Sequence, residues 1–197
     1  MSIRPATEAD EDALAQICLL TGNQGTDATG KFCDERVLSD VYALPYLYAP
    51  SGFAWVWEGG DGVAGYVVGT SDTRAFQQWF SDQWWPPRRA GREPRTDGDA
   101  WLLPAADDPA RMLNRHVDEY PAHLHIDLLP HVQGQGVGRQ LIAAAADVWE
   151  EWGVPGVHLE ASQANTGAQA FYPRVGFTEL GRDTRTVTWG IRLPRQG

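Results

Sequence analysis

The sequence has little cysteine, little positive charge and no long apolar run, and each shortage excludes a class of protein. Its two cysteines, Cys18 and Cys33, are too few for a disulfide framework and form no CxxC pair, so we expect both to be reduced. Sixteen Lys and Arg residues against 26 Asp and Glu residues give a net charge of −10, which disfavours binding to nucleic acid or an anionic membrane. No stretch approaches the roughly 20 apolar residues of a membrane span, and the N-terminus shows no apolar signal region. We therefore expect a cytoplasmic protein with no nucleic-acid or membrane partner.

Apolar and aromatic residues are abundant, with a hydrophobic fraction of 43% and nine tryptophans in 197 residues. That length suits one domain with a sizeable core, so we expect residues 1–197 to form a single α/β domain. Apolar periodicity and turn residues predict strands at about 3–4, 53–57, 63–69, 122–129, 156–160 and 184–192. They predict helices at about 8–22, 34–44, 72–85, 108–119, 136–152 and 165–175. Pro45 and the pair Pro86-Pro87 are expected to end helices, and the Pro-, Gly-, Asp- and Arg-rich segment 86–107 to form a long loop.

The strongest local signal is a glycine-rich loop between the strand at 122–129 and the helix at 136–152. Glycines at 134, 136 and 138 let backbone amides approach a bulky anion, and the following helix adds unpaired N–H groups and the positive end of its dipole. A phosphate loop of the Gly-Lys-Ser/Thr type is excluded because Arg139 follows Gly138. A dinucleotide fingerprint fails because its third glycine position is Arg139. The pattern predicts a site for a pyrophosphate.

Two motifs in this region resemble a known family. Gln133-x-x-Gly136-x-Gly138 is similar to the Gln/Arg-x-x-Gly-x-Gly/Ala motif of the GNAT superfamily of acyl-CoA-dependent N-acetyltransferases. Downstream, Asn165-x-x-Ala168-x-x-Phe171-Tyr172-x-x-x-Gly176-Phe177 looks like that family's second signature. The resemblance implies a single GNAT-like mixed sheet of about 6–7 strands flanked by helices, with an insert at about 71–121 before the fourth strand. Segments at 72–76, 84–87 and 123–130 further resemble bacterial proteins related to the acetyltransferase-like domain of O-GlcNAcase.

The same resemblance implies that acetyl-CoA is the co-substrate and indicates which residues hold it. The strand before the loop would pair with the pantetheine arm, the loop amides would hold the pyrophosphate, and the helix after Asn165 would line the arm and the acyl group. Capping of that helix explains Asn165 equally well, and core packing is compatible with Phe171. The cofactor-binding residues implied are Leu128, Leu129, Gln133, Gly134, Gln135, Gly136, Val137, Gly138, Arg139, Asn165, Ala168 and Phe171. A His-x-His pair without further ligands leads us to expect no metal.

Tyr172 is the candidate general acid, because the thiolate of coenzyme A must receive a proton when an amine attacks the thioester. A purely structural, half-buried tyrosine is the alternative. His123, His125 and Asp127 alternate along one strand and share a face. They line a functional cleft or form a satisfied polar network in the core. Asp127 is the preferred general base, since it lies nearest the loop, with His125 or ordered water as alternatives.

The insert departs from the short turn that this family usually has between its third and fourth strands. Its tryptophans suggest a wall or lid over an aromatic acceptor cleft shared with Tyr42, Tyr46 and Tyr48, while an accessory structural layer or a dimer contact is the alternative. Its arginines are solvated or reach the 3′-phosphate of the cofactor. The expected function is transfer of an acetyl group to a primary amine, carried by a small molecule or a peptide. A non-catalytic acetyl-CoA sensor or interaction module is the second hypothesis, a nucleotide-binding fold is the third, and the sequence leaves the oligomeric state open.

Overall fold

The computed structural model describes residues 1–194, and seven strands of this part form one sheet. The strands are β1 (Ser2–Pro5), β2 (Gly52–Gly59), β3 (Gly62–Thr70), β4 (Ala122–Leu128), β5 (Gly156–Ser162), β6 (Thr178–Arg182) and β7 (Thr186–Arg192). Their order in the sheet is β1-β2-β3-β4-β5-β7-β6, and β4 with β5 is the parallel pair among antiparallel neighbours. The predicted mixed sheet of about 6–7 strands is therefore confirmed, with β6 the strand that the sequence analysis missed.

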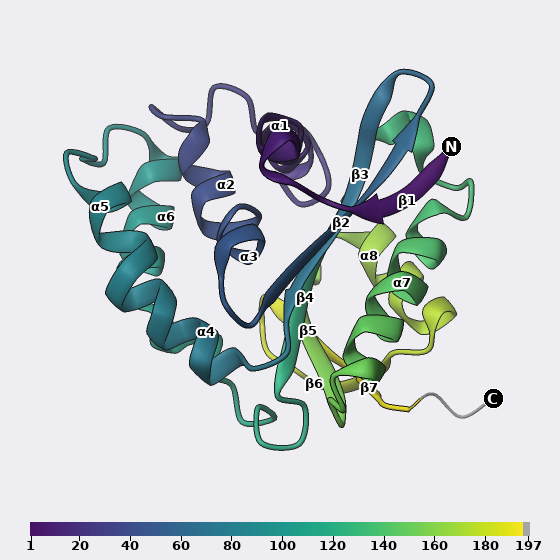
Figure 1. Cartoon of the computed structure of the whole chain (residues 1–197). Helices are drawn as coiled ribbons and strands as arrows, with labels where there is room; N and C mark the ends of the chain where they lie inside the picture. Colours follow the sequence, from purple (N-terminus) through teal and green to yellow (C-terminus); the bar gives the residue numbers. More distant parts are fainter. Residues whose placement is uncertain (195–197) are drawn as a thin grey trace.

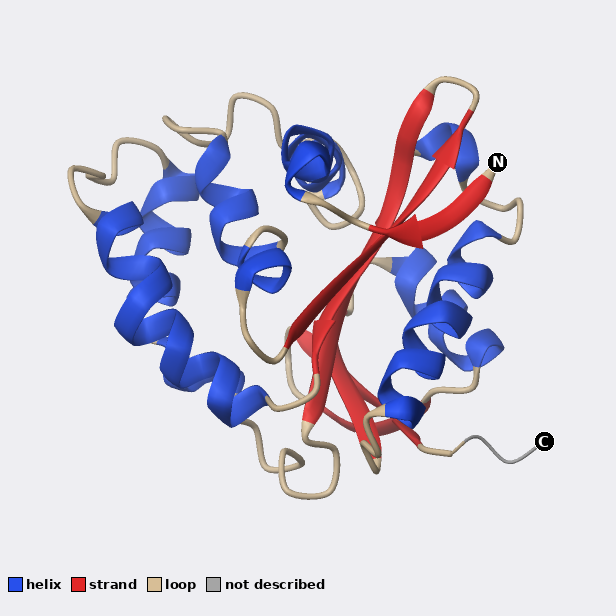
Figure 2. Cartoon of the chain, viewed as in Figure 1, coloured by secondary structure: helices blue, strands red, loops and turns tan. Residues whose placement is uncertain are grey.

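Helices cover both faces of the sheet (Figures 1 and 2). They are α1 (Glu11–Thr21), α2 (Arg36–Tyr42), α3 (Pro45–Tyr48), α4 (Thr73–Trp79), α5 (Trp85–Arg89), α6 (Asp97–Asp107), α7 (Val137–Glu151) and α8 (Thr166–Phe171). Helices α1 to α6 lie on one side of the sheet, and α7 and α8 on the other. Each side has its own apolar core, the first including Leu14, Phe76 and Leu102 and the second including Leu141 and Trp149. The predicted insert, between β3 and β4, supplies α4, α5 and α6 to the first of these layers.

The prediction of a long loop at 86–107 is wrong, because half of that segment is the helix α6 and its first residues belong to α5. Thr96 begins it with a capping box, in which its hydroxyl accepts from the N–H of Asp99 and the carboxylate of Asp99 accepts from the N–H of Thr96. Leu102 and Leu103 then bury one face of the helix. The Pro and Gly content concealed a capping signal that the sequence does contain.

Three prolines that were expected to end the preceding helices lie instead in the first turns of the helices that follow. Pro45 is the first residue of α3, and Pro86 and Pro87 stand in the first turn of α5, directly after a π-helical turn at Phe80–Trp84. A first-turn proline is tolerated because its missing N–H has no partner within the helix in any case. The helix expected at 108–119 is only a 3₁₀ turn, Pro109–Met112.

The sheet splits between its two parallel strands. Strands β4 and β5 pair only at Ala122 with Val157 and at His123 with His158. Beyond this point β4 continues to Leu128 and β5 continues to Ser162, but the two strands form no further pairs with each other. The two strands therefore diverge toward their carboxyl ends, the edge of an α/β sheet where ligands bind.

Candidate active site

The diverging strands enclose a cleft of about 1170 Å³, which contains several of the predicted site residues. It is lined by β4 from Leu124 to Asp127, by β5 from Leu159 to Ser162, and by Asn165, Ala168 and Tyr172. A side pocket of about 280 Å³ adjoins the cleft and shares His125, Leu159 and Glu160 with it. The structure thus brings Tyr172, Asp127 and the residues of α8 to one space.

One backbone edge of β4 faces this cleft. The N–H of Leu129 donates to the carbonyl of Ala64 at 2.9 Å, so odd-numbered residues of β4 direct their backbone groups toward β3. The alternation places the N–H and C=O groups of Leu124, Ile126 and Leu128 on the opposite edge, toward the diverged β5. The side chain of Gln133 donates to the carbonyl of Leu128 at 2.8 Å and anchors the glycine loop to this edge.

The glycines of the loop serve two different purposes. Gly134 and Gly136 have φ values of +73° and +82°, and a Cβ at either position would meet no atom within 4 Å. Gly136 is also the N-cap residue of the 15-residue helix α7, so its surroundings offer open space beside unpaired N–H groups. Gly138 lies within α7, and a Cβ there would stand 3.0 Å from the ring of Phe171. Gly134 and Gly136 therefore fit an anion site, whereas Gly138 permits close packing of α7 against α8.

The remaining predicted loop residues differ in exposure. Val137 is buried in the core beneath α7, whereas Gln135 and Arg139 are exposed. The side chain of Gln135 donates to the carbonyl of His131 at 2.7 Å, which closes the loop on itself. Backbone groups of the loop, rather than these side chains, are thus the groups best placed to meet an anion.

Helix α8 begins at Asn165, whose side-chain oxygen accepts from the N–H of Ala168 at 3.0 Å. This N-cap role accounts for the residue type. Both residues also line the cleft, so capping and contact with a ligand are compatible. Phe171 lies at the end of the same helix, where its ring packs against Gly138 and not among the residues that line the cleft.

Tyr172 follows α8 and is 7% exposed. Its ring packs against Phe171, Phe177 and Trp189, with ring centres 5.4 to 6.1 Å apart. Burial and, secondarily, the charge of Asp127 raise the pKa of the Tyr172 hydroxyl, which therefore stays protonated at neutral pH. A protonated phenol that lines the cleft is able to donate a proton there.

On β4, the predicted polar face is directed toward the layer of α1 to α6, and its three members have different surroundings. The carboxylate of Asp127 accepts from the hydroxyl of Tyr66 at 2.6 Å, and burial raises its pKa despite this hydrogen bond. The ring of His125 lies edge-on to Tyr42 and Tyr46, with centres 5.4 and 5.5 Å apart. Burial, and then the charge of Arg111, lower the pKa of His125 to about 4. His125 and Asp127 thus line the cleft in forms that can accept hydrogen bonds.

His123 is held within a polar network. The hydroxyl of Thr73 donates to the carbonyl of Pro121 at 2.7 Å, so its oxygen accepts from Nδ1 of His123 at 2.8 Å. Nε2 of His123 then accepts from the hydroxyl of Tyr46, also at 2.8 Å. Both ring nitrogens of His123 therefore have hydrogen-bond partners, and these bonds connect α3, the insert and β4. Of the three polar residues on β4, His123 is the one that matches the alternative of a satisfied polar network in the core.

The aromatic wall expected from three tyrosines is only partly present. Tyr42 and Tyr46 line the side pocket. Tyr48 instead donates to Glu11 at 2.9 Å and stacks on Trp84, with ring centres 5.4 Å apart.

Trp101, one of the insert tryptophans expected near the acceptor, lines the side pocket, as do Arg111, His158 and Glu160, which sequence reasoning did not select. Trp101 comes from α6, Arg111 from the 3₁₀ turn, and His158 and Glu160 from β5. His158 and Glu160 alternate on β5 as His123 and His125 do on β4, and this shared period could have revealed them. Arg111 carries no such local signal, because only the fold places the turn at Pro109–Met112 beside the cleft.

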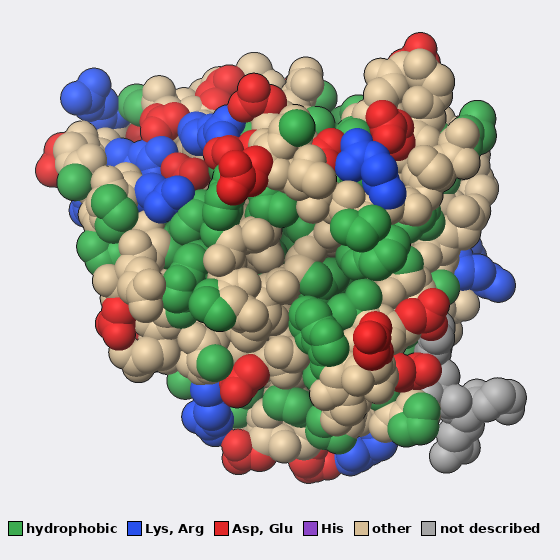
Figure 3. All heavy atoms as spheres, in the orientation of Figure 1, with side chains coloured by type: hydrophobic (Ala, Val, Ile, Leu, Met, Phe, Trp, Pro, Cys, Tyr) green, Lys and Arg blue, Asp and Glu red, His purple; other side chains and the backbone are tan. Residues whose placement is uncertain are grey.

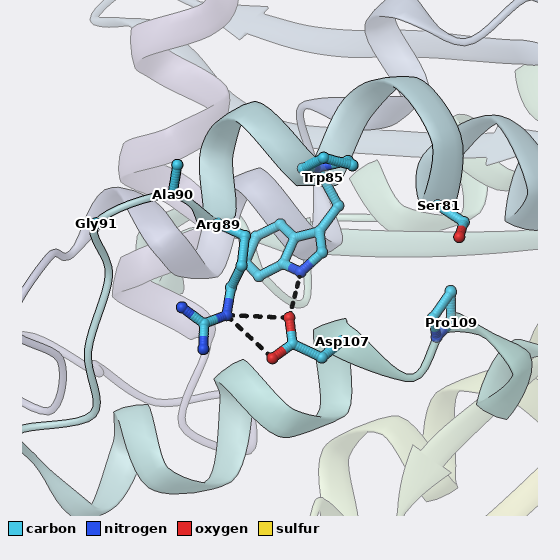
Figure 4. Close-up of a pocket in the computed structure, with 8 residues that line it drawn as sticks. Ser81, Trp85, Arg89, Ala90, Gly91, Asp107 and Pro109 are labelled. Carbon is cyan, nitrogen blue, oxygen red and sulfur yellow. Dashed lines mark hydrogen bonds and ion pairs between the residues drawn. The ribbon is translucent and has the colours of Figure 1, made fainter.

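Four other insert arginines, Arg74, Arg88, Arg89 and Arg92, form ion pairs with carboxylates. Arg92 pairs with Asp34 and Asp40, and Figure 3 shows Lys and Arg side chains lying among Asp and Glu side chains on this face. Figure 4 shows the outer hollow between α5 and α6, where Arg89 and the indole N–H of Trp85 both bind the carboxylate of Asp107. No lining residue of this hollow is shared with the cleft. The insert is therefore a structural layer whose inner side reaches the cleft, and not a loose lid.

The described residues contain neither a metal-binding cluster nor a helix able to span a membrane. Within residues 1–194, no group of three or more His, Cys, Asp and Glu side chains is arranged to hold a metal ion. In the same part of the chain, no helix combines the length and apolar character needed to cross a membrane.

Comparison with known proteins places this geometry in context. The family described as Acetyltransferase (GNAT) family matches residues 26–177. The crystal structure of a protein designated SsHAT is 36% identical, with 97% of each chain covered and a TM-score of 0.88. Two other structures share the fold. A GCN5-related N-acetyltransferase from Kribbella flavida is 16% identical, with 98% of this chain and 97% of its own covered and a TM-score of 0.59. A ribosomal-protein-alanine N-acetyltransferase from Brucella melitensis is 19% identical, with 98% and 100% covered and a TM-score of 0.57.

Proposed function

The chain belongs to the GNAT family of acetyltransferases, whose co-substrate is acetyl-CoA, and we propose that it transfers the acetyl group to a primary amine by direct attack while both substrates are bound. The two unlike faces of one cleft support this proposal most strongly. Ala168 of α8 and Tyr172 line the first face, near the edge of β4 to which Gln133 anchors the glycine loop, and His125, Asp127 and Glu160 line the second. Donor and acceptor would meet in the gap between β4 and β5 from opposite sides of the sheet.

We assign the cofactor to the first face. The edge of β4 at Leu128 would hold the pantetheine arm, because its backbone groups point toward the cleft. Amides from Gln133 to Arg139 would bind the pyrophosphate at the N-terminus of α7, since an anion is favoured there. Asn165 and Ala168, which line the cleft, would border the arm, and Phe171, which packs between α8 and Gly138, would lie near the acetyl group.

We assign proton transfers to one residue on each face. The amine attacks the thioester carbonyl, the tetrahedral intermediate collapses, and the carbon–sulfur bond breaks. Tyr172 would donate its proton to the departing thiolate, a form of general-acid help worth roughly 10²- to 10⁴-fold in rate. Asp127 would take the proton from the attacking amine, because burial makes its carboxylate a stronger base. His125 and ordered water are the alternative bases.

The proposal is tested by incubating the protein with acetyl-CoA and a panel of primary amines. We expect free coenzyme A thiol to be released together with a mass increase of one acetyl group on an amine. Calorimetry measures acetyl-CoA affinity in the same preparation. Binding of acetyl-CoA without turnover of any amine would favour the sensor or interaction module instead.

Three finer expectations stay predictions. They are the acceptor being a small molecule or peptide, the cytoplasmic location, and the action of residues 1–197 as one domain. The resemblance to the group related to the acetyltransferase-like domain of O-GlcNAcase also stays a prediction.

A further inference from the structure

The side pocket contains a positive charge that no carboxylate of the described chain neutralises. Arg111 forms no ion pair within residues 1–194, whereas the insert arginines Arg88, Arg89 and Arg92 all do. Its guanidinium donates to the carbonyl of Ala105 and lies over the ring of Tyr42, 5.6 Å from the ring centre. Its remaining N–H donors are therefore available on the side that lines the pocket.

Apart from Glu160, the titratable groups that line the side pocket with Arg111 are uncharged. His123 and His125 line the pocket beside it, and burial together with the charge of Arg111 lowers the pKa of both imidazoles. Tyr42 and Tyr46 are phenols with raised pKa values, so they are neutral as well. Arg111 is itself exposed, and where it lines this concave space of about 280 Å³ its charge favours an anion.

A negative charge stands where the side pocket opens into the cleft. Glu160 lines both spaces, is exposed, and accepts one hydrogen bond from the side-chain amide of Asn114 at 3.3 Å. A molecule that spans from Arg111 to this boundary thus meets a cation at one end and a carboxylate at the other. The second end is also the end toward His125 and Asp127, where the amine must be deprotonated.

From this arrangement we infer that the acceptor is a small amino acid-like compound, whose carboxylate is bound by Arg111 while its amine faces the acetyl group. The inference rests on the proposed function and names its substrate class. A guanidinium fork pairs with a planar carboxylate through two parallel hydrogen bonds. A phosphate dianion would meet one cation in a chain of net charge −10, with Glu160 close by. A lysine side chain of a peptide would leave Arg111 without a partner.

The test compares acceptors that differ only in the carboxylate. The standard amino acids, β-alanine and γ-aminobutyrate are each assayed beside the matching carboxamide. We expect a preferred acid to exceed its carboxamide in kcat/KM by roughly 10- to 100-fold, the range of a charge-assisted hydrogen-bonded pair. Arg111→Met removes this preference by raising KM for the acid, with unchanged acetyl-CoA affinity and nearly unchanged activity on the carboxamide. Arg111→Lys restores part of the preference.

Arg115→Met is the matched control, since Arg115 is exposed four residues further along and lines neither the cleft nor the side pocket. Equal use of acid and carboxamide, a preference for an aminoalkyl phosphate, or an equal loss on both acceptors in Arg111→Met would overturn the inference. Calorimetry with the same pairs on the protein saturated with coenzyme A tests carboxylate binding without turnover. Failure of the proposed function, seen as absence of thiol release with every amine, is thereby distinguished from failure of the inference.

Discussion

The two faces of the cleft are encoded in different ways. The face bordered by the glycine loop, α7 and α8 comes from one run of chain between Leu124 and Phe177, and its motifs are legible in the sequence. The opposite face is assembled from α2, α6, the turn at Arg111, β4 and β5, which are far apart in the sequence. In the proposed arrangement, a cofactor common to many proteins would be bound by a local motif, whereas the acceptor side would depend on how distant segments fold together.

Substitution of Gly136 is expected to have the largest effect and tests the first face. In Gly136→Leu, a side chain would occupy the open space beside the N-terminus of α7 and disturb a backbone with φ of +82°. We expect acetyl-CoA affinity, measured by calorimetry, to fall roughly 100-fold because an anion loses access to the amides.

Gly153→Leu supplies the control, since Gly153 follows the other end of the same helix with φ of +68° and equally open surroundings. Both variants carry a strain of about 1–2 kcal/mol. If both retain wild-type acetyl-CoA affinity, the loop assignment is wrong.

Tyr172→Phe asks whether the first face also contributes to the chemistry. We expect kcat to fall about 100-fold, with acetyl-CoA affinity nearly unchanged, because only the proton donor is lost. Tyr120→Phe is the matched control, as both tyrosines are 7% exposed and Tyr120 does not line the cleft. Unaltered turnover in Tyr172→Phe would leave the tyrosine a structural role only.

Asp127→Asn tests the second face through the pH dependence of kcat/KM. A base acts when deprotonated, so activity rises with pH through the pKa of Asp127, which burial places above the usual value of about 3.9. In Asp127→Asn we expect kcat/KM to fall roughly 10- to 100-fold and the rising limb of its pH profile to disappear. Tyr66→Phe removes a hydrogen bond that lowers the pKa of Asp127, so it should move the limb to higher pH. An identical limb in Asp127→Asn would transfer the role to His125 or water.

The smallest expected effect concerns stability in acid. Burial lowers the pKa of His123, His125 and His158, with the pKa of His125 at about 4. Between pH 6.5 and 4 the unfolded chain therefore binds more protons than the folded chain, and stability falls as pH falls. We expect His125 to account for roughly 2 kcal/mol of unfolding free energy lost between pH 7 and 5.

Urea unfolding of His125→Gln at both pH values should show a correspondingly smaller loss. His131→Gln, which alters an exposed histidine, should behave as wild type. A wild-type pH dependence in His125→Gln would show that acid acts through other groups of this face.

Sequence reasoning succeeded where structure follows from neighbouring residues. Most strands in their order along the chain, the long helix α7 and the positions of Asn165 and Tyr172 follow from periodicity and motif spacing. It failed in the insert, where prolines were read as helix ends and the capping box at Thr96 was overlooked. Arg111 was missed for another reason, since its importance arises only from the packing that brings it beside His125.

The base of the insert has a consequence for how this enzyme class diversifies. The N–H and hydroxyl of Thr73 both donate to the carbonyl of Pro121, at 2.8 and 2.7 Å, and Thr70 pairs with His123 across the sheet. Residues 71–121 thus leave and re-enter the sheet at one point, so β3 and β4 keep the register of a simple hairpin. Segments of other lengths could be grafted at this junction at little entropic cost, provided that they cover the core of α2 and α3. In the proposed arrangement, the insert beside the acceptor could thus be exchanged while the part of the fold that binds acetyl-CoA stays the same.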